Sequence, residues 1–330
     1  MSPALAVPLF LVSLAVTLAA ARLFARRLDR LGVRFGFPEA LIGLLTALAA
    51  DGPNVSSALF ALIKGAHDVG VGVLVGSNTF QLAAMIGLSA LLTGAVHVAR
   101  ETLLLEGVVG LVITVLAAAL LLRWLSAAVA VLLTALVLVP YLTLVIAGQR
   151  LSERPGSPLR RLAHALHEHA GPEPKQDIST NPTHHLLGLI VFDVVLIVAG
   201  SAGMVQAALT LGADWHIPHT VLGVLILAPL TSLPNALTAI RLGLAGRGAA
   251  LVGETFNSNS INLGVGVIAP SLFVTFTALS SVDKQQLGWL LAMTIAAVGL
   301  LALPRGMRRA EATLLVGLYF AFVVGTLVGS

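Results

Sequence analysis

The chain has 330 residues, of which 57% are hydrophobic and only 10% are charged, with a formal net charge of +4 at pH 7 and no cysteine. An ordinary soluble domain carries about a quarter charged residues, so this composition predicts an integral membrane protein and leaves too few polar residues for a soluble enzyme domain. The absence of cysteine excludes disulfides, and the lack of a soluble basic face argues against nucleic-acid binding.

Apolar runs of about 18 to 25 residues, the length of helices that cross a hydrocarbon core, recur along the chain. No alternating pattern of the barrel kind is found, so the sequence predicts an all-α membrane protein with ten transmembrane helices. The expected spans are 4–24, 38–64, 69–93, 103–122, 126–148, 186–211, 218–244, 249–277, 286–304 and 310–328.

The basic residues predict the orientation. Of the 19 Lys and Arg residues, all but Lys64, Arg123 and Lys284 lie in or beside the loops that follow odd-numbered spans. The positive-inside rule places these loops in the cytoplasm and both termini outside. The first span is expected to stay in the mature protein, because its basic cluster follows the apolar stretch. The lack of a large central domain and of a targeting segment fits a bacterial inner membrane.

The second span contains the polar stretch D-G-P-N-V-S-S-A-L from position 51. Pro53 removes a backbone donor and is expected to break the helix, leaving free backbone groups that need a partner, water or an ion. Asp51 is the only acid of the polar motif segments, and a carboxyl group at this depth must be paired, bound to a cation or protonated. Its alternative role is the N-cap of a half-helix that begins at Gly52 or Pro53.

The third span carries G-S-N-T-F-Q-L at 76–82, in which Ser77 and Gln81 are four residues apart and share one helical face. Two other acids of the first half, Glu39 and Glu106, lie near predicted span ends. Solvation is expected there, so neither is assigned a role.

One long loop, 149–185, divides the spans five and five. The expected units are a first repeat (1–148), this cytoplasmic loop and a second repeat (186–330). The stretch S-P-L-R-R-L-A-H-A-L-H in the loop has a helix-start signal and regularly spaced leucines, which predict a short amphipathic helix on the membrane surface. Its histidines could bind a metal, although a solvated polar face is favoured. They are His164, His167 and His169.

The second half repeats the polar segments of the first. S-L-P-N-A-L-T-A-I at 232–240 aligns with 51–59, and N-S-N-S-I-N-L at 257–263 with 76–82, both with an offset of 181 residues. Because five spans separate the copies, the second crosses the membrane in the opposite sense, which is the inverted-repeat plan of secondary transporters. Pro234 corresponds to Pro53 and predicts a second broken helix.

Two broken helices and two polar faces in corresponding positions predict one ion site near the middle of the membrane. The predicted ion-binding residues are Asp51, Asn54, Ser77, Gln81, Thr231, Ser232, Asn235, Ser258 and Asn262. The alternative is that these side chains only bridge neighbouring helices, aided by small residues such as Gly72 and Gly76.

Two acids of the second half are further candidates. Glu254, two turns before Asn262, is a candidate entry site or a residue that faces the headgroups. Asp193 lies inside the sixth span without an evident partner, so it is expected to face protein or water.

These segments resemble the cation/calcium antiporter superfamily, whose best-known members are sodium/calcium exchangers. That family carries G-T-S-x-P-E on its second and seventh helices and G-S-N-x-x-N or G-S-N-x-x-D on the third and eighth. This chain has A-D-G-P-N (50–54) and L-T-S-L-P-N (230–235), with G-S-N-T-F-Q (76–81) and N-S-N-S-I-N (257–262). The resemblance implies ten helices in two inverted five-helix repeats, with helices 2 and 7 broken, and a membrane protein that exchanges cations.

The departures from the family pattern concern charge. Asn54 and Asn235 stand where the family has its two ion-binding glutamates, and Gln81 and Asn262 are uncharged as well. A dication and a carboxylate about 4 Å apart attract by roughly 8 kcal/mol at an effective dielectric near 20. Since Ca²⁺ normally takes six to eight oxygens that include carboxylates, high-affinity Ca²⁺ exchange is not expected.

The sequence therefore predicts a secondary active antiporter with alternating access, for which Na⁺, H⁺, K⁺ or Ca²⁺ is the transported ligand and a monovalent cation or a proton is favoured. No cofactor, nucleic acid or obligate protein partner is expected, only membrane lipid and inorganic cations. One alternative is a transporter of a small polar organic solute, and another is a non-transporting member of the fold. Catalysis has the least support, because the motif residues provide neither a nucleophile with its base nor a metal cluster.

Overall fold

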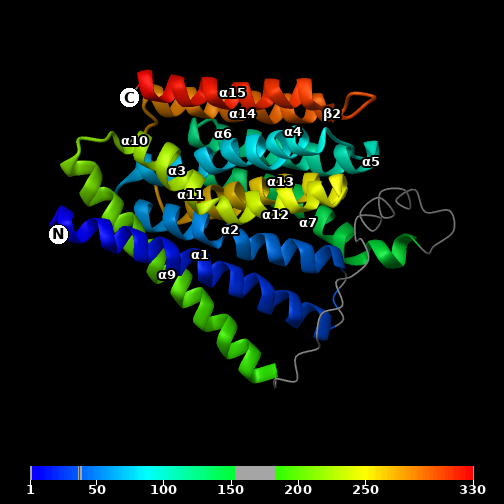
Figure 1. The fold of residues 1–330 in the computed structure, drawn as a ribbon, viewed down its shortest axis with the longest axis horizontal. Coiled ribbons are helices and arrows are strands. Elements are labelled where there is room, and N and C mark those ends of the chain that lie inside the picture. Colours follow the sequence, from blue (N-terminus) through cyan, green and yellow to red (C-terminus); the bar gives the residue numbers. More distant parts are fainter. Residues whose placement is uncertain (1, 36, 38, 153–182, 330) are drawn as a thin grey trace.

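The computed structural model describes residues 2–35, 37, 39–152 and 183–329. Over these residues each predicted span forms a helix, or a series of short helices, and the spans run roughly side by side (Figure 1). Most of the predicted central loop lies outside the described residues, together with its amphipathic helix and its histidines.

The first half begins with two long helices and continues with spans that change helical type along their length. Its elements are α1 (Pro3–Arg34), α2 (Glu39–Ile63), α3 (His67–Gln81), the π-helical segment η1 (Leu82–Leu88), α4 (Ser89–Thr93), β1 (Ala95–Val96), α5 (Arg100–Thr102), the π-helical segment η2 (Leu103–Gly107), α6 (Val108–Leu121) and α7 (Ala127–Ser152).

The second half repeats this order with one bent span. Its elements are α9 (Thr183–Asp214), α10 (His219–Val221), the π-helical segment η3 (Leu222–Leu227), α11 (Ala228–Thr231), α12 (Leu233–Leu244), α13 (Gly248–Leu263), the π-helical segment η4 (Gly264–Ile268), the short 3₁₀ helix η5 (Pro270–Leu272), α14 (Ser281–Leu301), β2 (Met307–Arg308) and α15 (Arg309–Gly329).

Some boundaries differ from the predicted ones. The first helix continues to Arg34, ten residues beyond the predicted span 4–24, because its basic end still has a neighbouring helix to contact. The eighth span ends earlier than the predicted 249–277, where Pro270 starts the 3₁₀ turn that closes it. A two-residue antiparallel pairing of β1 with β2 was not predicted, because it joins segments more than 200 residues apart.

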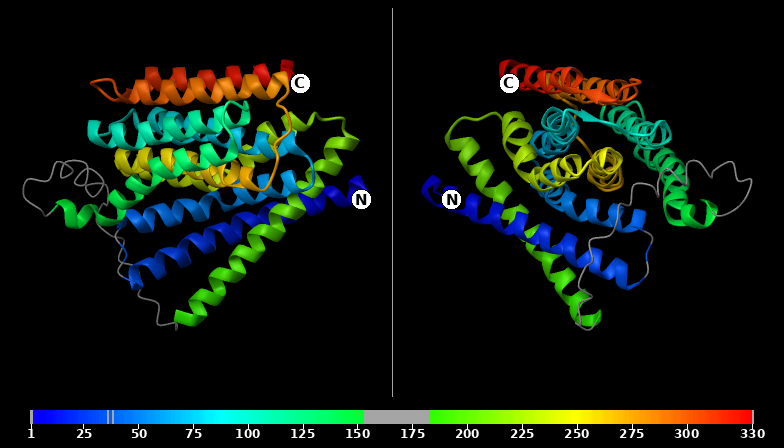
Figure 2. Two further views of the ribbon diagram at one scale, coloured as in Figure 1. Left: turned by 180° about the vertical axis from the view of Figure 1, so that it is seen from behind. Right: turned by 45° about the vertical axis from the view of Figure 1, so that its right-hand side comes forward.

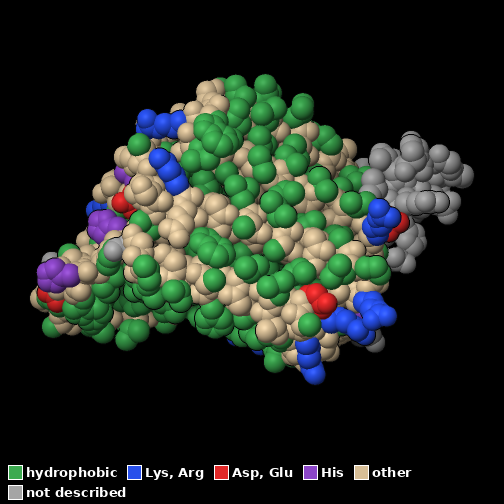
Figure 3. Space-filling model, turned by 90° about the horizontal axis from the view of Figure 1, so that it is seen from above, with side chains coloured by type: hydrophobic (Ala, Val, Ile, Leu, Met, Phe, Trp, Pro, Cys, Tyr) green, Lys and Arg blue, Asp and Glu red, His purple; other side chains and the backbone are tan. Residues whose placement is uncertain are grey.

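The helices form a central group with a pair on each side. Figures 1 and 2 show α1 and α9 on one side of α2, and α14 and α15 on the opposite side. Both described chain ends lie at the same end of the bundle, as an even number of crossings requires. Figure 3 shows that hydrophobic side chains cover the middle of one face, with charged side chains toward its two ends, as expected for a membrane protein.

The two halves also repeat in backbone detail. Gly65 and Gly246 are 181 residues apart, and both adopt a positive φ, 76° and 73°, at the ends of α2 and α12. The next residues, Ala66 and Arg247, donate their backbone N–H to Ala61 and Leu242 in the same pattern. A glycine in the left-handed region is a common helix terminator, so the sequence encodes the same stop twice.

Hydropathy separates α2 and α13 from the other spans. Within the described residues, seven helical spans are long and apolar enough to cross a membrane, and the bent pair formed by 219–231 and 233–244 makes an eighth. The remaining two spans, α2 and α13, contain the polar motifs, which lower their hydropathy. Polar spans of this kind need protein on all sides, because lipid offers no hydrogen bonds.

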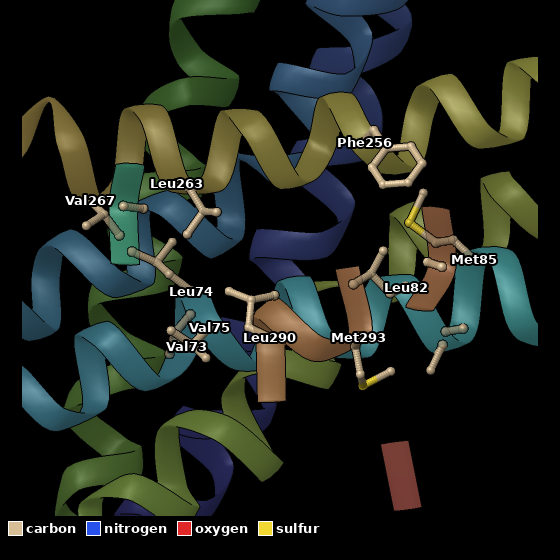
Figure 4. Packing of buried hydrophobic residues seen from close by; sticks show 14 of the residues in the cluster. Val73, Leu74, Val75, Leu82, Met85, Phe256, Leu263, Val267, Leu290 and Met293 are labelled. Atoms are coloured by element: carbon tan, nitrogen blue, oxygen red, sulfur yellow. The ribbon is translucent and has the colours of Figure 1, made fainter. Parts of the chain in front are cut away.

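The third span lies at the centre of the bundle, where α3 is buried along nearly its whole length. Leu74 packs toward Leu263 and Val267 of the eighth span, as Figure 4 shows. On the opposite side of α3 the backbone of η3 approaches so closely that a Cβ at Gly76 would lie 2.8 Å from the Cα of Val224. A glycine at this crossing allows the close contact that holds the third and seventh spans together.

The structure corrects the prediction at Pro53. α2 is one continuous helix with Pro53 inside it, so among the described helices only the seventh span is broken, with a bend of 48° between α11 and α12. A single proline removes one backbone donor but can be accommodated where neighbouring helices pack around it. The seventh span carries two prolines, Pro229 and Pro234, and its helix is interrupted at Ser232 between them.

Candidate functional site

Asp51 lies at the centre of a hydrogen-bond network in the middle of the bundle. Its side chain is fully buried in α2, and its Oδ1 accepts hydrogen bonds from Asn54 Nδ2 (3.2 Å), Gln81 Nε2 (3.2 Å), Asn235 Nδ2 (2.6 Å) and Ser258 Oγ (2.7 Å). These four donors come from α2, α3, α12 and α13. Both repeats therefore contribute to one carboxyl group, and their donors stabilise its charged form.

Several oxygens of the network are buried and have no hydrogen-bond partner among the described residues. They are Asp51 Oδ2, Asn235 Oδ1 and Asn262 Oδ1. A buried acceptor without a partner costs free energy, about 1–3 kcal/mol from mutational data. Carboxylate and amide oxygens of this kind are the ligands that hard cations prefer.

The donors around Asp51 also bind one another. Asn235 Nδ2 donates to Ser258 Oγ over 3.0 Å, and Ser258 Oγ lies 3.0 Å from Gln81 Oε1. Asn262 Nδ2 lies 3.4 Å from the same Gln81 oxygen. The Ser258 hydroxyl has a single proton, so it can serve either Asp51 or Gln81 at one time.

Three predicted site residues occupy other positions. Ser232 Oγ, at the break of the seventh span, donates to Asn54 Oδ1 over 3.3 Å and so belongs to the edge of the network. Ser77 and Thr231 instead direct their hydroxyls to the backbone, where both contact the carbonyl of Ala228, at 3.5 and 3.2 Å. The structure thus brings Ser77 and Thr231 together at the helix break without contact to Asp51.

The continuous helix around Asp51 also removes the alternative role considered for it. A residue caps a helix only where the helix begins, whereas α2 starts at Glu39, twelve positions earlier. Asp51 is an interior residue of α2 whose side chain points into the network.

Asn78 and Asn259 are network residues that the prediction omitted. Asn78 Oδ1 accepts from Asn262 Nδ2 over 3.0 Å, and Asn78 Nδ2 donates to the backbone carbonyl of Asn259 over 3.2 Å. Both asparagines are buried, and both side-chain polar atoms of Asn259 lack a partner. The sequence contains a signal that could have identified them. Both asparagines occupy the third position of a repeated motif, G-S-N or N-S-N, and they are related by the same 181-residue offset.

Glu254 lies next to the network. It is one turn before Ser258 on α13, it is half-buried, and its Oε2 has no partner in the part of the chain that the structure describes. It also lies within electrostatic range of Asp51. Two carboxyl groups thus approach the site from α2 and α13, one at its centre and one toward the start of α13.

Asp193 has the partner that the sequence did not reveal. Its Oδ1 accepts a hydrogen bond in an ion pair with Arg27 of α1, which also donates to the backbone carbonyl of Leu189. Arg27 lies beyond the predicted first span and becomes available only because α1 continues past it. The pair fixes α1 to α9 through a buried charge.

The described residues contain no group of three or more His, Cys, Asp or Glu side chains that could hold a metal ion. The central network is instead one carboxyl group surrounded by amides and hydroxyls. This network lacks the several carboxylates that are typical of tight Ca²⁺ sites.

Comparison with known families and structures gives a consistent result. The family model for the sodium/calcium exchanger protein matches residues 5–147 and 185–328, which include both repeats. No match was found among curated proteins.

Solved structures of the sodium-calcium exchanger NCX_Mj share the fold. The form soaked with 100 mM Na⁺ and 10 mM Sr²⁺ is 20% identical, with a TM-score of 0.63, over 98% of this chain and 99% of that chain. The form soaked with 2.5 mM Na⁺ and 10 mM Sr²⁺ is also 20% identical, with a TM-score of 0.62 and the same coverage. The ten-helix arrangement of inverted repeats is therefore shared across the whole chain.

Proposed function

The chain belongs to the sodium/calcium exchanger protein family, and from this membership and the central network we propose that it is a secondary active cation antiporter. The transported ion would bind at Asp51 between the two repeats. Access would alternate by movement of α1 and α9 against the central helices, since this pair lies at one side of the bundle (Figure 1). The ion pair between Arg27 and Asp193 would make the two helices move together.

The hydrogen bonding of the two carboxyl oxygens of Asp51 supports an ion at this position. Its Oδ1 is saturated by four donors, whereas its Oδ2 is buried without a partner. A carboxylate held in this way presents one free anionic oxygen to a cation. The unpartnered oxygens of Asn235 and Asn262 supply neutral ligands nearby.

The charge of the site supports a monovalent cation or a proton over Ca²⁺. Asn54 and Asn235 are neutral, so Asp51 is the single acid inside the network. A monovalent cation with one carboxylate forms a neutral complex, whereas a dication would leave a net positive charge in a site of low dielectric. Na⁺, K⁺ and H⁺ are thus the favoured ligands, with Ca²⁺ as a weak one.

The alternative of a small polar organic solute has less support. The amide and hydroxyl groups could hydrogen-bond such a solute without charge, but they already contact one another directly at 3.0–3.4 Å. A solute would have to separate these helices. The transport experiment includes this case, and that of a non-transporting protein, as outcomes.

The test uses the full chain reconstituted in vesicles. Uptake of ²²Na⁺, ⁸⁶Rb⁺ or ⁴⁵Ca²⁺ is measured under an opposing gradient of H⁺, Na⁺ or K⁺, for the native protein, for Asp51→Asn and for Asp214→Asn. Asp214 is an exposed acid at the end of α9 and serves as the matched control.

We expect gradient-driven uptake of a monovalent cation that Asp51→Asn abolishes and Asp214→Asn retains. Unchanged transport by Asp51→Asn would refute the site. Silence for every cation would refute antiport, and uptake of an organic solute would then support the alternative.

The orientation and the membrane are part of the proposal. Both termini would lie outside a bacterial inner membrane, with the repeats at 1–148 and 186–330 separated by a cytoplasmic loop. Because the chain has no cysteine, Lys64→Cys and Arg241→Cys each provide a single thiol at an exposed residue. A membrane-impermeant thiol reagent added outside should label position 64 and spare position 241, and the reverse pattern would invert the topology.

A further inference from the structure

Like Asp193, Glu106 is a buried acid outside the central network. Glu106 was predicted to be solvated near a span end, but its side chain is only 5% exposed. It belongs to η2, where the π-helical winding changes the direction of the side chains relative to an α-helix, so a position counted as interfacial points into the bundle. Glu106 therefore needs a partner or a proton within the membrane.

Its partners come from two other spans. The hydroxyl of Tyr141 in α7 lies 3.1 Å from Glu106 Oε1 and 3.0 Å from Oε2, and the same hydroxyl lies 2.7 Å from Asn257 Oδ1 in α13. One phenol oxygen thus lies within hydrogen-bond distance of three acceptor atoms. Since a tyrosine has a single hydroxyl proton, it can satisfy only one of them.

A proton on Glu106 allows both contacts of the Tyr141 oxygen to be hydrogen bonds. If Glu106 is a carboxylic acid, its O–H donates to the Tyr141 oxygen, and the Tyr141 O–H donates to Asn257 Oδ1. If Glu106 is a carboxylate, Tyr141 donates to Glu106, and the Asn257 oxygen loses its donor. Of the two contacts, the one to Asn257 is the shorter, as expected if the Tyr141 proton points to the Asn257 oxygen, which leaves Glu106 to supply the proton of its own contact.

We propose that Glu106, Tyr141 and Asn257 form a proton-binding site separate from the ion site at Asp51, in which a proton on Glu106 sets the direction of the hydrogen bonds through Tyr141. The proton enters on a Glu106 carboxyl oxygen from water and leaves by the same group. No other bond is made or broken.

The position of Asn257 connects this site to the central one. Asn257 is adjacent to Ser258, whose hydroxyl donates to Asp51, so successive residues of α13 face the two sites. Loss or gain of the Tyr141 hydrogen bond to Asn257 would act on the helix that also positions Ser258. This coupling rests on the proposed antiport, in which the proton would be the exchanged ion.

Among the described residues, the elements packed around Glu106 bring two titratable groups near it, Tyr141 and Glu254. α6 carries no titratable side chain, α14 contributes Val298 beside Gly107, and α13 presents Gly253, where a Cβ would lie 3.8 Å from Glu106 Oε1. On α5, Arg100 and Glu101 are exposed. Of the described titratable groups, Tyr141 is thus the one in contact, and Glu254 on α13 is a further carboxyl group next to Gly253.

Infrared difference spectroscopy of the reconstituted protein tests the site directly. A protonated carboxyl group has a C=O stretching band well separated from that of a carboxylate. At neutral pH the native protein should show this band, Glu106→Gln should lose the part of it that Glu106 contributes, and Glu101→Gln, which removes an exposed acid of the same span, should leave it unchanged. An unchanged band in Glu106→Gln would overturn the proposal.

Tyr141→Phe provides a second variant that keeps Glu106 in place. Without the phenol oxygen, the acid loses its acceptor, so its C=O band should persist and shift to higher wavenumber. No shift would show that Glu106 does not donate to Tyr141 and would also overturn the proposal. The amide bands of the same spectra show whether each variant retains its helices.

Transport then tests the coupling. In the native protein, the affinity for the transported cation should differ by roughly 5- to 150-fold between the two protonation states of Glu106, the usual range of coupling between two sites. Glu106→Gln should remove this pH-dependent difference. Full pH dependence in this variant would overturn the coupling. If the native protein transports no cation at all, the proposed antiport fails, while the infrared result still decides whether Glu106 binds a proton.

Discussion

In the first repeat Asp51 lies inside a continuous helix, whereas its counterpart in the second repeat, Ser232, lies at the break between α11 and α12. The pair Asn54 and Asn235 and the pair Gln81 and Asn262 are amide in both repeats. The two repeats thus carry matching amide residues, but, within the described residues, only the first has a central acid and only the second has a broken helix. An inverted repeat can therefore carry one charge at its centre without a matching charge in its partner half.

The same asymmetry extends to the serines. Ser258 in the second repeat donates to Asp51, while Ser77, at the corresponding position of the first repeat, contacts a backbone carbonyl of α11. The charge of one repeat is therefore held chiefly by donors of the other, because the two shortest bonds to Asp51 come from Asn235 and Ser258. Substitutions that move or add charge in either repeat therefore test this arrangement.

The largest effect is expected from moving the charge between the repeats. Asp51→Ser should reduce cation transport by more than about 100-fold, because the network loses its only carboxyl group. Adding Ser232→Asp should restore part of the activity, since Ser232 already contacts Asn54. Tracer uptake in vesicles measures both. No recovery in the double variant would mean that the break in the seventh span cannot hold a charge.

A smaller change is expected when glutamates replace the two corresponding asparagines, Asn54 and Asn235. Asn54→Glu together with Asn235→Glu should raise Ca²⁺ affinity by roughly 100-fold, or about 2.7 kcal/mol, because a dication then has carboxylate ligands from both sides. Calorimetric titration with Ca²⁺ measures the gain, and Asn54→Gln with Asn235→Gln is the neutral control. An unchanged affinity would show that the site geometry does not suit Ca²⁺.

The contact between the repeats at α1 and α9 should contribute to stability. Arg27→Ala leaves Asp193 buried without its partner and should lower the free energy of unfolding by about 3–5 kcal/mol. Combining it with Asp193→Leu should recover most of this loss, since no charge then remains. Thermal unfolding in detergent measures both variants, and equal loss in the single and double variants would contradict the ion-pair explanation.

The smallest effect concerns the two serines. Ser258→Ala removes a hydrogen bond to a charged group, about 1.5–3 kcal/mol, and should weaken cation binding roughly 10- to 100-fold. Ser77→Ala removes only a 3.5 Å contact with a backbone carbonyl and should weaken binding less than about 10-fold. Binding titrations of the two variants compare them, and equal losses would mean that the serines have equivalent roles.

Much of the fold could be predicted from the sequence, because apolar length, repeated polar segments and basic loops are properties of consecutive residues. The family resemblance rested on four segments, and the comparisons confirmed the family and the fold. The ligand roles of the predicted site residues remain proposals, although the structure places Asp51, Asn54, Gln81, Asn235, Ser258 and Asn262 in one network.

Other features depended on contacts that consecutive residues do not specify. Pro53 has the same local signal as Pro234, but packing around α2 keeps its helix continuous while the seventh span is broken. The partner of Asp193 lies 166 residues away, and the partners of Glu106 lie on two other spans. Whether such groups are solvated or buried is a matter of helix rotation, which a π-helical segment changes.

The sequence by itself determined that this chain crosses the membrane repeatedly, that its halves are inverted copies, and that amides occupy positions where charge would be expected. Only the tertiary structure decided which oxygens face Asp51, which hydroxyls turn to the backbone, and which acid lies buried beside a tyrosine. The physical reason is range: composition and periodicity act along a helix, whereas a hydrogen bond to a buried carboxyl group depends on how several helices are rotated and packed against one another.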